Sequence, residues 1–250
     1  VSPWAHLLEL NSTHPLTGKR IRRLSERAGA SRFNFSEIHE RFPVDRSRLY
    51  GEFARDVAVL ALPAALAIGF PLAYLAAALL EVVSLSIFTL AGGWLLAIGI
   101  AFLVGAVYRY PGGEAEETTV LDLLTDVYAS PVDGRRMALD GELIGRGTAG
   151  YRFSEDLMFQ DHTGLMYLKY DSWLPVLGDF LFSVRQVPGL IGESVRVEGW
   201  YFRGTSPWMG LRRLRTDERE LQGFVHFGSF VGAGITMLLG LVILAVPLVL

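Results

Sequence analysis

The 250-residue sequence contains no cysteine. A disulfide framework, thiolate metal ligands and a cysteine nucleophile are therefore excluded. The H-E-x-x-H zinc helix, the Walker phosphate loop, the G-x-G-x-x-G turn and the G-x-S-x-G elbow are also missing. No histidine pairs with another at metal-ligand spacing, and the five are His6, His14, His39, His162 and His226. The sequence thus carries no complete catalytic motif of these kinds.

Charge is absent from three long stretches, residues 57–80, 82–107 and 227–250, in a chain that is 51% hydrophobic. Each stretch is long enough to cross a hydrocarbon core, which needs roughly 20 helical residues. We therefore expect three transmembrane helices in a multi-pass protein of the cell (cytoplasmic) membrane, with the lipid bilayer as one partner. The chain starts at Val1 without methionine and stops inside an apolar run, so we expect a fragment cut at both ends, its third helix truncated.

The first two apolar stretches are separated only near Glu81, which predicts a tight helical hairpin. Small residues such as Gly92, Gly93 and Gly99 in the second helix would let it approach the first closely, or they reflect only how common small residues are in membrane helices. Glu81 is expected to be a solvated turn residue rather than an intramembrane functional carboxylate.

Lysine and arginine are distributed unevenly around these stretches. Residues 1–55 hold ten Lys/Arg against six Asp/Glu, and Arg109 follows the second stretch. Four arginines precede the third stretch, whereas the hairpin turn has no basic residue. By the positive-inside rule, the soluble parts are expected to face the cytoplasm.

The chain divides into four parts. A basic, mostly helical segment (residues 1–55) precedes a two-helix transmembrane hairpin (56–109), a soluble domain (112–222) and a third transmembrane helix (227–250). The expected fold class is a membrane α-helical protein with an α+β or all-β soluble insertion.

Within the soluble domain, strand-like periodicity follows a short helix, Val120–Tyr128. The Asp161–Gly164 stretch is a predicted hairpin turn, and Asp171–Ile191 is a longer excursion. Five short strands of this kind suit a small barrel of the OB type: Met137–Arg146, Leu157–Gln160, Leu165–Tyr170, Ser194–Phe202 and Trp208–Leu214. Leu139–Gly147, Phe159–Met166 and Gly192–Trp200 resemble successive strands of OB-like domains.

Many OB folds bind single-stranded nucleic acid by stacking bases on aromatic side chains. Residues 111–222 hold twelve Lys/Arg against eighteen Asp/Glu, a formal charge of −6, whereas a nucleic-acid groove is basic. No nucleic acid is expected as a partner. The aromatic residues of this region are expected in the core or at the membrane surface: Tyr151, Phe153, Tyr167, Tyr170, Trp173, Trp200 and Tyr201.

One short segment of the N-terminal part stands out. Ser12-Thr13-His14-Pro15 is followed, six residues after the histidine, by Arg20-Ile21 and then Leu24. This segment, about fifteen residues long, resembles a stretch near the end of the catalytic domain in membrane zinc metallopeptidases of the HtpX and CAAX prenyl protease type. The same residues also suit a helix entry, with Thr13 as the cap and Pro15 in the first turn.

The resemblance implies a role for two residues. His14 would stabilise the oxyanion or orient the scissile carbonyl, and Arg20 would hold the local network or a substrate carboxylate. The zinc ligands and the general-base glutamate of that family are not in this chain and are expected upstream of Val1. The zinc would be bound there, and these 250 residues alone are expected to be inactive.

We therefore interpret the sequence as the C-terminal part of a zinc metalloendopeptidase that cleaves protein or peptide substrates at the cytoplasmic membrane face, in the manner of protein quality control. The rival hypothesis is a non-enzymatic, membrane-anchored OB-like interaction module. A small transporter or channel has little support, because three spans with scarcely any polar residue offer no ion path.

Overall fold

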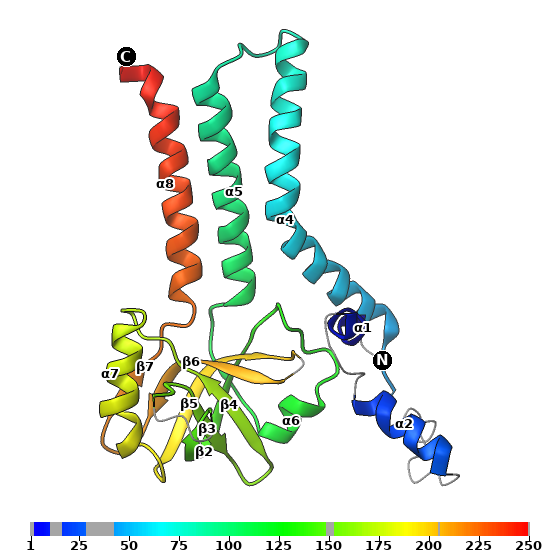
Figure 1. Ribbon diagram of the computed structural model, residues 1–250, viewed down its shortest axis with the longest axis vertical. Coiled ribbons are helices and arrows are strands. Elements are labelled where there is room, and N and C mark those ends of the chain that lie inside the picture. The colour runs from blue at the N-terminus through cyan, green and yellow to red at the C-terminus, as the bar shows by residue number, and fades with distance from the viewer. Residues whose placement is uncertain (1–2, 11–16, 29–42, 149–152, 205, 250) are drawn as a thin grey trace.

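The computed structural model describes residues 3–10, 17–28, 43–148, 153–204 and 206–249. It consists of three long apolar helices and a small five-stranded barrel, preceded by two short helices, α1 (Pro3–Leu10) and α2 (Thr17–Ala28). Figure 1 shows the barrel, α1 and α2 at one end of the three long helices. The expected fold class is confirmed.

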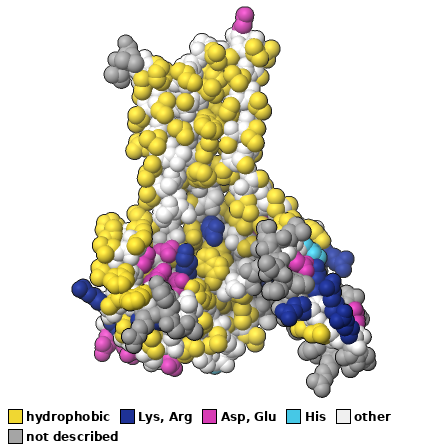
Figure 2. Space-filling model, viewed as in Figure 1, with side chains coloured by type: hydrophobic (Ala, Val, Ile, Leu, Met, Phe, Trp, Pro, Cys, Tyr) yellow, Lys and Arg dark blue, Asp and Glu magenta, His cyan; other side chains and the backbone are white. Residues whose placement is uncertain are grey.

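Three helices are long and apolar enough to cross a membrane: α4 (Arg46–Leu79), α5 (Ile87–Arg109) and α8 (Phe227–Val249). Apolar side chains cover them, whereas charged side chains gather around the barrel and the N-terminal helices (Figure 2). These properties match the three predicted spans and make the chain a multi-pass membrane protein.

The first span differs from its prediction in length. α4 has 34 residues and includes residues 46–55, which we expected to belong to the basic segment ahead of the hairpin. It begins after Asp45, whose Oδ1 accepts hydrogen bonds from the backbone N–H groups of Ser47 (2.9 Å) and Arg48 (3.2 Å). A helix of this length is about 50 Å long, whereas the hydrocarbon core is about 30 Å thick. Part of α4 therefore stands outside the bilayer.

The hairpin turn between α4 and α5 is longer than expected, because α5 begins only at Ile87. The Tyr74 hydroxyl ties the turn to α4: it donates to the carbonyl of Ser84 (2.9 Å) and accepts from the N–H of Ser86 (3.0 Å). Glu81 is exposed and has a φ of 59° in this turn. It lies in the turn rather than within a span, as expected.

The glycines of α5 correct one expectation. A Cβ atom on Gly99 would lie 2.5 Å from Cγ of Met237, and one on Gly92 would lie 2.8 Å from the carbonyl oxygen of Gly240. Both contacts are with α8, so these two glycines bring α5 close to α8 and not to α4 as we expected. Only Gly93 faces the first span, against the ring of Phe70.

The soluble domain is a closed barrel. Its strands are β2 (Arg135–Arg146), β3 (Leu157–Gln160), β4 (Leu165–Lys169), β5 (Ser194–Phe202) and β6 (Trp208–Arg215). They follow the order β2-β3-β4-β6-β5, and β5 pairs with β2 to close the ring. All neighbours are antiparallel except β4 and β6, which are parallel. A five-stranded barrel closed in this way is of the OB type.

Short elements complete the domain. Helix α6 (Val120–Thr125) precedes the barrel, and it is shorter than the predicted Val120–Tyr128. The expected excursion between β4 and β5 contains α7 (Leu177–Arg185) and the 3₁₀ turn η1 (Val187–Gly189). Two short strands pair at the edges: β1 (Glu116–Glu117) with β2, and β7 (Glu220–Gln222) with β6.

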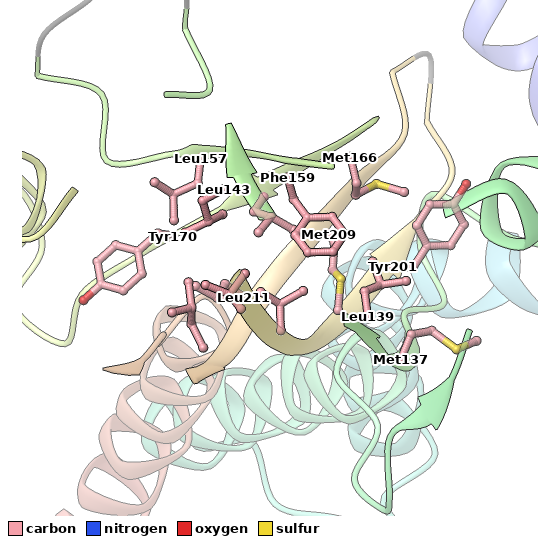
Figure 3. Packing of buried hydrophobic residues seen from close by; sticks show 14 of the residues in the cluster. Met137, Leu139, Leu143, Leu157, Phe159, Met166, Tyr170, Tyr201, Met209 and Leu211 are labelled. Carbon is pink, nitrogen blue, oxygen red and sulfur yellow. The ribbon is translucent and has the colours of Figure 1, made fainter. Parts of the chain in front are cut away.

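Alternate residues of the strands fill the barrel. Leu139, Leu157 and Phe159 are fully buried and meet Met209 and Leu211 from β6 (Figure 3). Of the aromatic residues expected in the core or at the membrane surface, several are buried: Tyr170, Trp200 and Tyr201. Trp173 and Phe153 are exposed, and Tyr151 lies outside the described residues.

The barrel has a membrane-proximal and a membrane-distal end. At the proximal end, Tyr110 follows directly after α5 and packs edge-on against Trp200, with ring centroids 5.1 Å apart. The indole Nε1 of Trp200 donates a hydrogen bond to the carbonyl of Pro111 (2.9 Å). The distal end is formed by the far part of β2, where Glu142 pairs with Gln160 of β3 and Ser194 of β5.

Candidate functional site: the Asp56 junction

The two residues named by the resemblance are only partly covered by the structure. His14 lies outside the described residues. Arg20 lies in α2 and is exposed. Its neighbour Lys19 forms an ion pair with Glu9 of α1, so the two N-terminal helices are tied to each other. The proposed roles of His14 and Arg20 stay predictions.

Helix α1 is in turn fixed to the first span. The ring of Trp4 packs edge-on against Phe53 of α4, with ring centroids 5.2 Å apart. The indole Nε1 of Trp4 donates a hydrogen bond to Oδ2 of Asp56 (2.6 Å). Both partners lie within one turn of α4, where it meets the apolar stretch.

Asp56 is the meeting point of three parts of the molecule. Its side chain also accepts hydrogen bonds from the hydroxyl of Tyr108 in α5 (2.7 Å to Oδ1) and from Oγ of Ser130 ahead of the barrel (2.7 Å to Oδ2). Only 1% of the residue is exposed. We call Asp56, Trp4, Tyr108 and Ser130 the Asp56 junction.

Hydrogen bonds hold the side chain of Asp56 in one position. Hydrogen bonds to an ionised carboxylate are stronger than neutral ones, and three of about four acceptor positions of Asp56 are occupied. Ser130 Oγ also accepts from the N–H groups of Val132 (2.9 Å) and Asp133 (3.1 Å). A carboxylate held in this way positions its neighbours.

A second carboxyl group lies close by. Burial raises the pKa of Asp133, and the negative charge of Asp56 raises it further, while the positive charge of Arg55 acts in the opposite direction. The junction is therefore an acidic centre balanced by a basic residue at the start of the first span. Sequence reasoning missed Asp56, although a lone carboxylate directly before an apolar stretch was the available signal.

A cavity of about 390 Å³ lies above the junction, between α4, α5 and α8. Small and apolar residues such as Pro63, Ala101 and Gly232 line it, and Arg109 closes it toward the barrel. The guanidinium of Arg109 lies over the ring of Phe202, 5.2 Å from its centroid, in a cation–π contact.

The membrane-distal end of the barrel carries a larger, polar cleft of about 660 Å³. Acidic and basic side chains share its lining, and Arg196 pairs there with Asp140 (2.8 Å) and with Glu117 just outside the cleft (2.7 Å). The cleft has room for a polar ligand or a peptide segment.

The Asp161–Gly164 turn forms one wall of this cleft and adopts the predicted hairpin. Oδ1 of Asp161 accepts from the N–H groups of Thr163 (2.7 Å) and Gly164 (2.8 Å), and Oδ2 accepts from the N–H of Val120 at the start of α6 (2.8 Å). Burial by itself would raise the pKa of Asp161, but these hydrogen bonds and that of the Thr163 hydroxyl outweigh it and hold the pKa below its usual value. Asp161 thus has a structural role as the cap of the turn.

The described residues do not fit a zinc ion, because they contain no group of three His, Asp or Glu side chains that could hold a metal. No family model matches the chain, and no curated protein matches it. Its function is therefore inferred from its residues and their contacts.

Proposed function

We propose that this chain is the membrane-embedded, positioning part of a zinc metalloendopeptidase that cleaves protein or peptide substrates at the cytoplasmic face of the membrane. One observation carries the proposal: α1, which directly precedes the His14 segment in sequence, is bound through Asp56 to both the spans and the barrel domain. The resemblance supplies the chemistry, and the position of the Asp56 junction beside the apolar part of α4 supports a reaction near the bilayer surface.

Helix α1, which precedes His14 in the sequence, and helix α2, which follows it and contains Arg20, are both held by side-chain contacts. α1 is held by Trp4 on Asp56, and α2 is held to α1 by the Lys19–Glu9 ion pair. A reacting group that is misplaced by about 1 Å can lose two orders of magnitude in rate. Fixed helices on either side of His14 in the sequence are what a membrane peptidase needs in order to meet substrates that lie at a fixed depth in the bilayer.

Each group has a separate role in the proposed reaction, according to its chemical type. In this proposal the zinc and the general base would be held by residues outside this chain, and the bound zinc would supply the Lewis acidity for a scissile carbonyl. His14 donates a hydrogen bond to the developing oxyanion, and Arg20 binds a carboxylate of the substrate or of the protein. The cavity between α4, α5 and α8 and the adjoining barrel domain together guide the substrate.

The cytoplasmic placement is supported by the distribution of basic residues. The hairpin turn carries no Lys or Arg, whereas the opposite ends of the spans carry Arg55 and Arg109. α1, α2 and the barrel lie at that same end (Figure 1), which favours a common side for all soluble parts.

A second function has one observation in its favour. The polar cleft at the distal end of the barrel points away from the spans and is large enough for a partner segment. A membrane-anchored interaction module would use this cleft and would need no hydrolytic chemistry.

The test uses the protein that carries a zinc-binding part together with this chain. We expect His14→Ala to lower the rate of proteolysis about ten- to thousand-fold, the typical loss of one oxyanion donor, with the bound zinc unchanged. His6→Ala, at an exposed position of α1, is the matched control and should retain activity. Equal turnover of the two variants would reduce His14 to a helix cap and favour the interaction module.

A further inference from the structure

A run of exposed apolar residues precedes α7. Trp173, Leu174, Pro175, Val176 and Leu177 are all exposed, Trp173 by 64% and Val176 by 82%. We call residues 173–177 the apolar loop. Soluble surfaces seldom present contiguous apolar patches of this kind unless the patch contacts a partner or a membrane.

The exposure continues along α7. Leu177, Phe180, Leu181 and Val184 are exposed at the i, i+3, i+4 and i+7 positions of one helical stripe. The opposite side of the helix packs on the barrel, where Phe182 is buried and stacks on Tyr170 with ring centroids 3.6 Å apart. The barrel core is thus complete without the exposed stripe. Figure 2 shows apolar side chains gathered over this flank of the domain.

The apolar loop has a fixed conformation. Oδ1 of Asp179 accepts from the N–H of Ser172 (2.6 Å), and Oδ2 accepts from the N–H of Val176 (3.0 Å). Val176 has a φ of 66°, which is unfavourable for a β-branched residue. The clamp by Asp179 therefore holds a strained backbone that presents its apolar side chains outward, and strain of this kind concentrates at functional surfaces.

The loop lies where the third span begins. The N–H of Phe224 donates to the carbonyl of Asp171 (2.7 Å). Phe224 is three residues before the start of α8, and Asp171 is two residues before Trp173. From this point α7 and η1 run toward the distal end, where the N–H of Gly192 donates to the carbonyl of Leu143 (2.7 Å). Figure 1 shows α7 on the flank of the barrel below the start of α8.

We propose that the apolar loop inserts into the interfacial layer of the bilayer and docks the barrel domain on the lipid surface. Tryptophan favours this layer because its ring is apolar and its N–H is polar. The loop lies at the level at which α8 enters the membrane. This position favours lipid over a soluble partner as the material that covers the loop. The proposal depends on the three spans alone and holds whether or not the chain belongs to a peptidase.

The absence of cysteine allows a direct test. A nitroxide label is placed through Leu174→Cys or Leu177→Cys in the full chain, in nanodiscs that each hold one copy. Leu165→Cys is the matched control, since Leu165 is also apolar and 53% exposed. Leu165 is the first residue of β4. It lies about 20 Å from Asp171, because each strand residue advances the chain by about 3.3 Å.

We expect the labels at positions 174 and 177 to collide with lipid-soluble oxygen more than with a water-soluble nickel chelate, and the label at position 165 to show the reverse. A label introduced through Val184→Cys lies about 10 Å further along α7 than the label at position 177. Of these two labels, the one at position 184 should lie less deep in the bilayer. Preference for the nickel chelate at positions 174 and 177 would overturn the proposal. Dipolar broadening between labels at position 174 in liposomes would also overturn the proposal, because it would show that the loop contacts a second copy of the protein.

A second measurement avoids any label. Brominated lipids should quench the fluorescence of the unmodified protein more than that of Trp173→Phe, because the replacement removes the interfacial indole. Equal fractional quenching of the two proteins would contradict insertion of the loop.

Discussion

Removal of the Asp56 carboxylate tests how the soluble parts are joined to the membrane. Asp56→Ala removes the acceptor of three hydrogen bonds at a site that is 1% exposed. The hydroxyls of Tyr108 and Ser130 can rotate toward other acceptors, but the indole N–H of Trp4 cannot. A buried donor that loses its partner costs about 1–3 kcal/mol, so we expect a decrease of that size in the free energy of unfolding.

Trp4→Phe separates the hydrogen bond from the packing. The phenyl ring can keep the edge-on contact with Phe53, while the bond to Asp56 is lost. A hydrogen bond to a charged group contributes about 1.5–3 kcal/mol, which is the expected cost. Because both changes affect one network, the double variant should cost less than the sum of the single variants.

The assay follows thermal unfolding in nanodiscs together with protease cleavage after α1. Glu52→Gln is the control, because Glu52 lies one turn earlier on α4 and pairs with Arg48 at i,i+4 spacing. Such a pair contributes about 0.3–0.5 kcal/mol. If Asp56→Ala and Glu52→Gln gave the same stability and α1 stayed equally resistant to protease, Asp56 could not be the anchor described above.

Three further predictions concern the barrel, the spans and the topology. Asp161→Asn should lower the stability of the barrel at pH 7 by about 1–2 kcal/mol; since its folded pKa lies below the unfolded value, the unmodified protein should lose this contribution as the pH falls below about 4, and the variant should lack that loss in acid titrations followed by circular dichroism. Gly99→Ala should destabilise the α5–α8 packing by about 1–3 kcal/mol, whereas Gly105→Ala, with open space around its Cβ position, should be close to neutral in the same thermal unfolding assay. Single cysteines introduced by Glu81→Cys and Leu165→Cys should react with impermeant reagents from opposite sides of the membrane; labelling from one side only would reject the hairpin topology.

The sequence predicts the barrel well because its signals are local. Strand positions alternate between buried and exposed residues, and the Asp161–Gly164 turn is fixed by hydrogen bonds between neighbours in the chain. The bounds of β3 and β5 agree with prediction at both ends, whereas β2 and β6 extend by one or two residues.

The Asp56 junction could not be predicted because its contacts are distant in sequence. Trp4 and Tyr108 are each 52 residues from Asp56, and Ser130 is 74 residues away. The partner of Gly92 and Gly99 was missed for a similar reason: an apolar helix has no polar face to show which neighbour it packs on. Residues 46–55 are continuous with the span in α4 because no proline interrupts residues 46–62, so nothing ends the helix before the span.

The most direct test of the proposed function compares one peptide in two forms, free in solution and anchored to the bilayer by a lipid. The protein that carries a zinc-binding part together with this chain is reconstituted in liposomes, and cleavage is measured with and without a zinc chelator. We expect chelator-sensitive cleavage that is faster for the anchored peptide, and Asp56→Ala should reduce this preference. No chelator-sensitive cleavage of either form would contradict the assignment to a membrane zinc metalloendopeptidase.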